Sequence, residues 1–240
     1  SSQNEQDNRI YSKLALLPMM EPSTPAEAKD MIAEACRVSE ELELPLIFRT
    51  TTRVNHARGI VEFGTPEETS AKGRFEKDTA RFVNIPAFAK KNRVKLLDLN
   101  RKAMALSESS PLNFIEGEGD TGVITSGVSY TYVKEYIKDV QILKLGFTNP
   151  LPEKKIADFI KGKSRIIVVE ELEPFLEDQV LRISAQNKLS VPVYGKRSGH
   201  LPVEWEYSPD VVVRLKDLVK MDEPPVPLKP VDIKLPGRPP

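Results

Sequence analysis

Short apolar runs recur through the second half of the chain, and amphipathic segments separate them. We predict strands at 122–127, 140–145 and 165–170, and helices at 129–137, 152–160 and 175–186. Mostly apolar strands that alternate with helices are typical of a parallel sheet covered on both faces. The pattern therefore predicts an α/β fold, which a short strand at 191–194 and a helix at 209–220 would complete.

The first part of the chain carries a second pattern of helices and a strand. A short helix is predicted at 8–16. A longer helix should begin at Pro25, where Thr24 is placed to cap it and Glu27 completes a capping box. Apolar positions then recur at helical spacing, and an apolar run at 44–51 indicates a buried strand with a polar end.

The middle and the end of the chain are less clearly patterned. Residues 66–73 are expected to form a loop, and 87–106 a basic helix without interleaved aromatic residues. A solvated helix face is favoured there over a phosphate-binding surface. Residues 222–240 are rich in proline and read as an extended linker. Because the chain opens on a dense polar segment and stops within this linker, we expect further sequence at both ends.

Composition argues against several classes of protein. The 35 basic residues balance the 35 acidic ones, which disfavours nucleic acid or an anionic membrane as the main partner. No apolar run approaches the length of about 18 residues that a membrane-spanning helix needs. One cysteine excludes a disulfide framework and fits a cytoplasmic protein. With only two histidines besides, a zinc site is disfavoured and an iron–sulfur cluster cannot be ligated.

A polar block opens the chain and forms the first candidate site segment: Ser1-Ser-Gln-Asn-Glu-Gln-Asp-Asn-Arg9. Its amides, Asn4 among them, offer donors and acceptors without charge, and Asp7 and Arg9 are placed to pair. The structural alternative is helix capping by Asp7 or Asn8, which leaves the other side chains unexplained. We therefore expect one wall of a pocket here, with Asn4, Asp7 and Arg9 as binding residues.

Residues 49–56 form the second candidate segment, at the polar end of the first predicted strand. Strand ends of this kind are where α/β sheets place ligands. Arg49 and Arg53 each carry a planar guanidinium that can clamp a carboxylate, with a salt bridge as the structural alternative. Thr51 and His56 complete the set, and for His56 a site role and a structural role weigh about equally.

Four other features favour structural roles. Residues 117–122 precede a strand and lack the Lys-Ser/Thr of a phosphate loop, so a turn is expected. Glu170 and Glu171 at a strand end allow acid–base chemistry, although a structural role weighs more. The loop at 195–200 could hold an anion or be an ordinary loop. Cys36 borders an apolar stripe and is predicted to be a small buried side chain.

Three segments together resemble the alpha subunit of the indolepyruvate:ferredoxin oxidoreductase family: Ser1–Arg9, Glu21-Pro-Ser-Thr-Pro-Ala-Glu-Ala28 and Phe48-Arg-Thr-Thr-Thr-Arg-Val-Asn-His56. Their order is similar to the second half of its pyrimidine-binding domain. The stretch 122–186 resembles the transketolase-C-terminal-like domain that follows, through Leu145-Gly-Phe-Thr-Asn-Pro-Leu-Pro152 and Val168-Val-Glu-Glu171.

The resemblance implies a larger enzyme than this chain. Enzymes of this family bind thiamine diphosphate with Mg²⁺, carry 4Fe-4S clusters, and pair the alpha subunit with a beta subunit. They convert indolepyruvate and other aryl 2-oxo acids to acyl-CoA, with CoA as co-substrate and ferredoxin as electron acceptor. This chain contains no Gly-Asp-Gly motif for the diphosphate and no cysteine clusters. The resemblance therefore implies no catalytic residue within the chain and no activity for it alone.

The resemblance also implies a division of the chain. Residues 1–64 would be the C-terminal half of the pyrimidine-binding domain, 65–119 a connection, 120–220 the transketolase-C-terminal-like domain, and 221–240 a linker. Two other functions remain open at this point. One is a noncatalytic α/β module for binding or subunit assembly. The other is a CoA-binding domain that uses the basic segment at 90–102.

Overall fold

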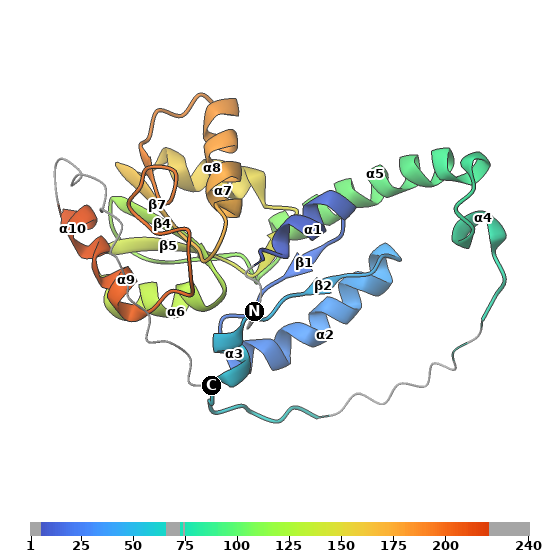
Figure 1. Ribbon diagram of the computed structural model, residues 1–240, viewed down its shortest axis with the longest axis horizontal. Helices are drawn as coiled ribbons and strands as arrows, with labels where there is room; N and C mark the ends of the chain where they lie inside the picture. The colour runs from blue at the N-terminus through green and yellow to red at the C-terminus, as the bar shows by residue number, and fades with distance from the viewer. Residues whose placement is uncertain (1–5, 66–72, 74, 221–240) are drawn as a thin grey trace, which may run out of the picture.

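Two sheets and the helices that cover them make up the described structure, a computed structural model that describes residues 6–65, 73 and 75–220. A five-stranded sheet lies at one end and a small sheet near the middle (Figure 1). The strands are β1 Met19–Met20, β2 Ile47–Phe48, β3 Phe114–Gly117, β4 Thr121–Ser126, β5 Val140–Leu145, β6 Phe147–Asn149, β7 Arg165–Val169 and β8 Val193–Tyr194. The helices are α1 Arg9–Ala15, α2 Pro25–Leu42, α3 Thr52–His56, α4 Thr79–Phe82, α5 Pro86–Ser109, α6 Gly127–Tyr136, α7 Glu153–Lys161, α8 Phe175–Gln186, α9 Pro209–Val213 and α10 Leu215–Lys220.

The large sheet has the order β3-β5-β4-β7-β8. Strands β5, β4, β7 and β8 run parallel to one another. Strand β3 lies at one edge and pairs antiparallel with β5. Side chains of α7 and α8 pack with one face of the sheet, and those of α6, α9 and α10 with the other. The predicted sheet with helices on both faces is thereby confirmed, with the correction that its edge strand β3 is antiparallel.

The small sheet places β1 between β2 and β6. β1 runs parallel to β2 and antiparallel to β6, so segments far apart in sequence meet in one sheet. Helix α2 packs on this sheet through Met31, Ala35, Val38 and Leu42. Met20 lies in that cluster, whereas its neighbour Met19 points the other way into the core of the large sheet. Strand β1 therefore joins the two halves of the hydrophobic core.

The start of α2 follows the predicted capping box. The Thr24 side chain accepts a hydrogen bond of 3.1 Å from the Glu27 amide, and Glu27 accepts one of 2.6 Å from the Ser23 amide. Glu27 also pairs with Lys144 of β5, whose side chain is fully buried. Burial lowers the pKa of Lys144, while the Glu27 charge opposes that shift. The cap therefore also ties α2 to the large sheet.

The turn between β3 and β4 depends on two glycines. Gly117 has φ 75° and Gly119 has φ 147°, both in the region that favours glycine. A Cβ at Gly119 would lie 2.4 Å from the carbonyl oxygen of Asp139. The predicted turn at 117–122 is confirmed, because these glycines allow the backbone to pass close to the start of β5.

Several local predictions differ from the structure. The strand predicted at 44–51 is reduced to β2, and the residues after it form the short helix α3. Strands β3 and β6 were not predicted, because they are only four and three residues long, although burial alternates along β3. Cys36, predicted to be buried, is exposed, because the helix turns it to the solvent side of α2. The loop predicted at 66–73 and the linker at 222–240 fall almost entirely outside the described residues.

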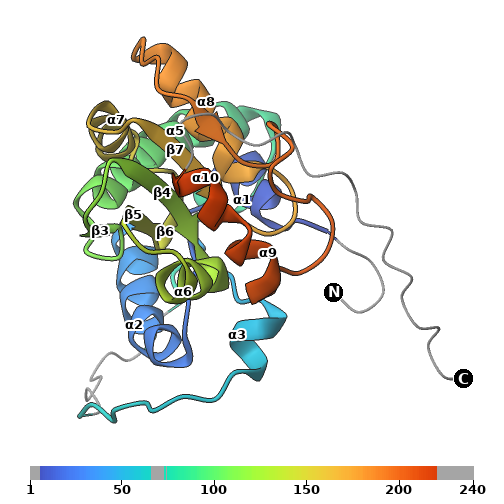
Figure 2. The ribbon, with the colours of Figure 1, turned by 90° about the vertical axis from the view of Figure 1, so that its left-hand side faces the viewer.

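The helix predicted at 87–106 is α5, and it leaves the body of the molecule. Figure 1 shows α5 extending away from the large sheet toward α4, and Figure 2 shows α6, α9 and α10 together on one face of that sheet. The large sheet takes β3 from the range predicted as a connection, and the small sheet takes β6 from the later domain. The predicted domain boundaries stay a prediction. Among the described helices, none has the length and apolar content to cross a membrane.

Candidate functional site

The first candidate segment contains a buried arginine. Arg9 begins α1, and only 2% of its side chain is exposed. Its Nε lies 2.9 Å from Oδ1 of Asp7, its Nη2 lies 2.5 Å from Oδ2 of Asp7, and its Nη1 lies 2.6 Å from Oε2 of Glu170. Nη2 also donates to the backbone carbonyl oxygens of Glu171 and Glu173. Arg9 therefore attaches the start of the described chain to the carboxyl end of β7.

Burial and charge have opposite effects on the pKa values of Arg9 and its carboxylate partners. Burial by itself would lower the pKa of Arg9, but the charge of Glu170 and the bond to Asp7 raise it above its usual value. Burial raises the pKa of Asp7, and the Arg9 side chain outweighs this and lowers it. Glu170 also accepts the amides of Leu176 and Glu177, so it caps the start of α8. Burial nevertheless raises the pKa of Glu170, because it outweighs the opposing charge of Arg9 and these two hydrogen bonds.

A second buried pair lies where β1 and β2 end. Arg49 follows β2, and its Nη1 pairs with Oε1 of Glu21, which follows β1. Arg49 Nε donates a 2.6 Å hydrogen bond to Oδ1 of Asn8. The Arg49 side chain is 10% exposed and that of Glu21 is 1% exposed. The carboxyl ends of the two parallel strands thus bring Glu21, Arg49 and the start of α1 to one edge of the small sheet.

Polar atoms without partners collect along the same chain segments. Oε2 of Glu21, Oγ of Ser23 and Oγ1 of Thr51 are buried and have no hydrogen bond among the described residues. Nη2 of Arg49 also has no hydrogen-bond partner within the described structure. Buried polar groups are usually satisfied, so this edge offers free donors and acceptors for a bound molecule. Arg49 with its open nitrogen suits a carboxylate.

The remaining predicted site residues are placed differently. Arg53 and His56 lie on α3 and are exposed to solvent. Arg53 Nε forms a 2.9 Å salt bridge with Glu206, and both side chains are about half exposed. Asn4 lies outside the described residues. The structure therefore brings Asp7, Arg9, Arg49 and Thr51 into one region, and leaves Arg53 and His56 on a separate exposed helix.

The loop at 195–200 already holds an anion, and that anion is Glu177. Its carboxylate accepts hydrogen bonds from the backbone amides of Lys196, at 2.7 Å, and Arg197, at 3.0 Å. The Lys196 ammonium turns inward to the carbonyl oxygen of Pro202, at 2.8 Å, and lies 4.6 Å from the centre of the Tyr207 ring. Burial lowers the pKa of Lys196 to about 8. The structural interpretation of this loop is thus favoured.

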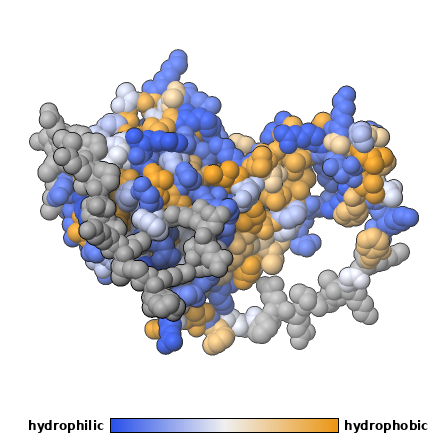
Figure 3. All heavy atoms as spheres, viewed as in Figure 1, coloured by the Kyte–Doolittle hydropathy of each residue, from blue (hydrophilic) through white to orange (hydrophobic). Residues whose placement is uncertain are grey.

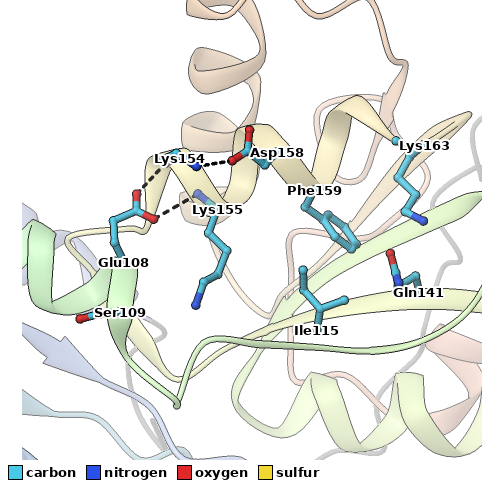
Figure 4. A pocket seen from close by; sticks show the side chains of 10 residues that line it. Glu108, Ser109, Ile115, Gln141, Lys154, Lys155, Asp158, Phe159 and Lys163 are labelled. Atoms are coloured by element: carbon cyan, nitrogen blue, oxygen red, sulfur yellow. Dashed lines mark hydrogen bonds and ion pairs between the residues drawn. The ribbon is translucent and has the colours of Figure 1, made fainter.

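A surface groove of about 610 Å³ lies away from these residues, between α5, β3, β5 and α7 (Figure 4). Its charged groups are bound within the protein. Glu108 accepts the backbone amides of Lys154, at 2.6 Å, and Lys155, at 3.1 Å, so it caps α7. Lys154 also pairs with Asp158, and the Lys155 ammonium donates to the carbonyl oxygen of Asn113. The hydrogen bonds of Glu108 therefore hold α5 against the start of α7.

The described residues offer partners for a carboxylate or a polar ring, but no ligands for the Mg²⁺ that the family resemblance implies. The edge at Glu21, Arg49 and Thr51 offers unsatisfied polar atoms that suit a carboxylate or a neutral polar ring. Across the described part of the chain, no cluster of His, Cys, Asp or Glu could hold a metal ion. The Mg²⁺ that accompanies the diphosphate therefore has no matching cluster of ligands among these residues.

Comparison with curated proteins finds several relatives that are subunits of one kind of enzyme. The chain matches part of the indolepyruvate oxidoreductase subunit IorA. The subunit from Methanothermobacter marburgensis is 42% identical over 221 residues, which cover 89% of this chain and 36% of that protein. The one from Thermococcus kodakarensis is 43% identical over 208 residues, covering 82% and 32% respectively. The chain thus spans about a third of the length of these relatives.

Solved structures show a shared fold with a second enzyme. The 2-oxoglutarate:ferredoxin oxidoreductase from Magnetococcus marinus aligns over 85% of this chain and 42% of its own, with a TM-score of 0.55 and 13% sequence identity. This likeness confirms the predicted α/β fold class. No family model matches the chain. The predicted resemblance to the IorA type of subunit is confirmed by the curated relatives.

Sequence reasoning missed the partners of the predicted arginines. Glu21 holds Arg49, and Glu170 holds Arg9, although neither acid was in the predicted site set. For Glu21 a usable signal existed, since a charged residue directly follows a short apolar stretch at a strand end. For Glu170 no local signal could have identified Arg9, because 161 residues separate the two in sequence.

Proposed function

We propose that this chain is part of the catalytic subunit of an oxidoreductase that oxidatively decarboxylates indolepyruvate and related aryl 2-oxo acids. In this proposal CoA accepts the acyl group and ferredoxin accepts the electrons, as partners of the intact enzyme together with a beta subunit. The observation that supports it is identity above 40% to the IorA subunits over more than four fifths of this chain.

The edge formed by Glu21, Arg49 and Thr51 is where this chain would contribute to the reaction. Arg49 would bind the substrate carboxylate through its open Nη2, while Glu21 and Asn8 fix its orientation. The unsatisfied Oγ1 of Thr51 would donate to the substrate or to the cofactor ring. Thiamine diphosphate, when bound, supplies the carbanion chemistry of decarboxylation. Asp7 and Arg9 would support this wall from behind, as positioning residues.

The proposal includes the predicted division of the chain. Residues 1–64 would belong to the pyrimidine-binding domain, 65–119 to a connection, 120–220 to the transketolase-C-terminal-like domain and 221–240 to a linker. Mg²⁺, the diphosphate and the 4Fe-4S clusters would be held outside this chain, which would be inactive alone. Arg53 and His56 would lie at the outer rim of the pocket, where α3 faces solvent, and Asn4, which lies outside the described residues, is kept as a predicted binding residue.

The intact enzyme tests the substrate class. Full-length subunit with its beta subunit, thiamine diphosphate and Mg²⁺ should reduce ferredoxin when given indolepyruvate and CoA. Activity with 2-oxoglutarate but not with aryl 2-oxo acids would overturn the proposed substrate class. No reduction with any 2-oxo acid would overturn the reaction itself.

A pair of arginine variants tests the site. Arg49→Lys keeps the positive charge beside Glu21 but removes the planar fork, and should lower kcat/KM by about 100-fold. The matched control is Arg37→Lys on α2, which should change kcat/KM less than about threefold because Arg37 is exposed and pairs only with acids of its own helix. Equal kinetics for Arg49→Lys and wild type, with unchanged melting temperature, would remove Arg49 from the site.

A further inference from the structure

Helices α6, α7 and α8 connect the parallel strands of the large sheet, and two of them begin on a carboxylate. The second and third amides of α7 donate to Glu108, at 2.6 and 3.1 Å. The second and third amides of α8 donate to Glu170, at 2.8 and 2.9 Å. In this sheet, these two amides of a helix are thus the groups that bind a negative oxygen.

The corresponding amides of α6 have no such partner. Helix α6 follows β4, the central strand, and its second and third amides belong to Val128 and Ser129. Among the described residues, no oxygen accepts a hydrogen bond from either amide. The residue at the cap position, Ser126, forms no hydrogen bond to them through its side chain. The described residues therefore leave the positive end of this ten-residue helix unsatisfied.

Two buried hydroxyl groups lie at the same helix start. Ser126 is 6% exposed and Ser129 is 1% exposed. Neither hydroxyl has a hydrogen-bond partner within the described structure, whereas those of Thr125 and Thr131 each donate to a carbonyl oxygen, at 2.8 and 2.7 Å. Because Cβ atoms of a helix tilt toward its N-terminus, the Ser129 hydroxyl is directed to the end where Ser126 lies. Buried polar groups are usually satisfied, so this pair indicates a bound molecule.

There is space for a ligand beside these groups. Gly127, the first residue of α6, has φ 55°, which favours glycine. Apart from the adjoining backbone, no atom lies within 4 Å of the position that its Cβ would take. On the face seen in Figure 3, hydrophilic and hydrophobic residues are interleaved around the large sheet. The helix start is therefore distinguished by its polar groups and its open backbone, and not by an apolar patch.

The carboxylates near this side of α6 are bound within the protein. Helix α3 packs against α6 (Figure 2) and carries Arg53, and Tyr132 lies one turn after Ser129. Burial raises the pKa of Tyr132, the charge of Arg53 opposes that shift, and the charges of Glu171 and Glu206 add to it. Glu206 pairs with Arg53, and Glu171 accepts a backbone amide at 2.9 Å. Neither acid therefore caps α6.

We propose that the start of α6 binds a phosphate group. The amides of Val128 and Ser129 and the hydroxyls of Ser126 and Ser129 are four donors at the positive end of one helix. At α7 and α8 two amides satisfy a carboxylate, so the two additional hydroxyls suit the further oxygens of a tetrahedral phosphate. The phosphate is either the free ion or the end of a phosphate ester. This site does not depend on the proposed reaction.

An NMR titration of the isotope-labelled 240-residue chain with sodium phosphate tests the proposal, with ionic strength held constant by sodium chloride. The amide signals of Val128 and Ser129 should shift and saturate with a single dissociation constant. Sodium acetate should bind at least about tenfold more weakly, because it offers two oxygens to four donors. Glycerol 3-phosphate distinguishes the two sources: binding at least as tight as that of free phosphate assigns the site to an ester, and weaker binding assigns it to the free ion.

Two variants change the site in different ways. Ser129→Ala deletes one hydroxyl and should raise the dissociation constant of phosphate about tenfold. Ser126→Asp places a tethered carboxylate at the cap position, where it should accept the Val128 and Ser129 amides and abolish phosphate binding without lowering the melting temperature. The matched control Thr131→Ala removes a hydroxyl of the same helix that already has a partner, and should change the phosphate affinity less than about twofold.

Three results would overturn the proposal. The first is that the amide signals at the start of α6 stay in place up to about 50 mM phosphate. The second is that acetate binds as tightly as phosphate, which removes the phosphate class. The third is that the signals shift equally in Ser126→Asp and in wild type, which places the ion elsewhere. If Ser129→Ala does not fold, the comparison of Ser126→Asp with wild type still decides.

Discussion

Two parts of the candidate site use arginine in opposite ways. Under α1, Arg9 is almost fully buried, and two carboxylates and two carbonyl oxygens surround it. On α3, Arg53 forms one salt bridge to Glu206, and both side chains remain about half exposed. Arg9 therefore joins two segments that are distant in sequence, whereas Arg53 forms an ion pair at the surface. Burial decides which role each arginine has.

Arg49 lies between these two cases. One nitrogen is fixed by Glu21 and another by Asn8, while the third is open and a tenth of the side chain is exposed. A charge held in this way keeps its orientation and can still reach a ligand. Among the predicted arginines, Arg49 thus has the geometry of a binding residue, Arg9 that of a structural tie, and Arg53 that of a surface pair.

The strongest test of this comparison removes the buried arginine. Arg9→Ala leaves Asp7 and Glu170 buried without a counter-charge, and should lower the free energy of unfolding by about 3–5 kcal/mol. Urea unfolding followed by circular dichroism measures the change. The control Arg37→Ala breaks two exposed pairs on α2 and should cost less than about 1 kcal/mol. Similar losses for both variants would contradict the distinction.

The next prediction concerns pH and Lys196. The folded pKa of about 8 lies below the ordinary value of 10.5, so the unfolded chain binds the proton more tightly. Between these values the unfolded state carries more protons, and stability should rise with pH by on the order of 3 kcal/mol. Below pH 8 the buried ammonium is a constant cost. Between pH 7 and 10.5 the unfolding free energy of wild type should therefore rise by about that amount relative to that of Lys196→Met.

Subtracting the Lys196→Met curve of unfolding free energy against pH from the wild-type curve removes the contribution of other groups that titrate in the same range. Parallel curves would show that Lys196 has an ordinary pKa in the folded protein. In that case its ammonium would be in contact with water, and the inward position beside Pro202 and Tyr207 would be wrong.

A smaller effect is expected at the cap of α2. Thr24→Ala removes the acceptor for the Glu27 amide and should cost about 1 kcal/mol in urea unfolding. Thr24→Ser keeps the hydroxyl oxygen and should restore most of that loss. Equal stability for the two variants would show that the cap contributes nothing beyond the pairing of Glu27 with Lys144.

The smallest effect should come from the exposed pair on α3. A double-mutant cycle with Arg53→Ala and Glu206→Ala should give a coupling energy of about 0–1 kcal/mol. It should fall further in high salt, since exposed charges are screened. A coupling energy above about 2 kcal/mol would place this pair with the buried ones and remove the contrast between the two regions.

Local chemistry explains which parts of the fold could be predicted. The start of α2 was predictable because Thr24, Pro25 and Glu27 act on one another within a few residues. Strands β4, β5 and β7 were predictable because burial on both faces requires continuous apolar runs.

Long-range pairing explains what could not be predicted. Helix α3 has no apolar period, because it is only five residues long and buries Val54 alone. The partner of Arg9 is Glu170, which only the folded topology brings near. The pairing of Asp7 with Arg9 was predictable, since two residues separate them, but its burial was not. Site chemistry that combines distant strand ends is therefore visible only in the structure.

The loop at 195–200 has a consequence for competition among anions. Because Glu177 is covalently part of the chain, its carboxylate has a high effective concentration at the amides of Lys196 and Arg197. Free phosphate or sulfate would have to displace a tethered group from both amides at once. A backbone arrangement suited to anions is thus kept permanently saturated, and selectivity against soluble anions follows from connectivity rather than from charge.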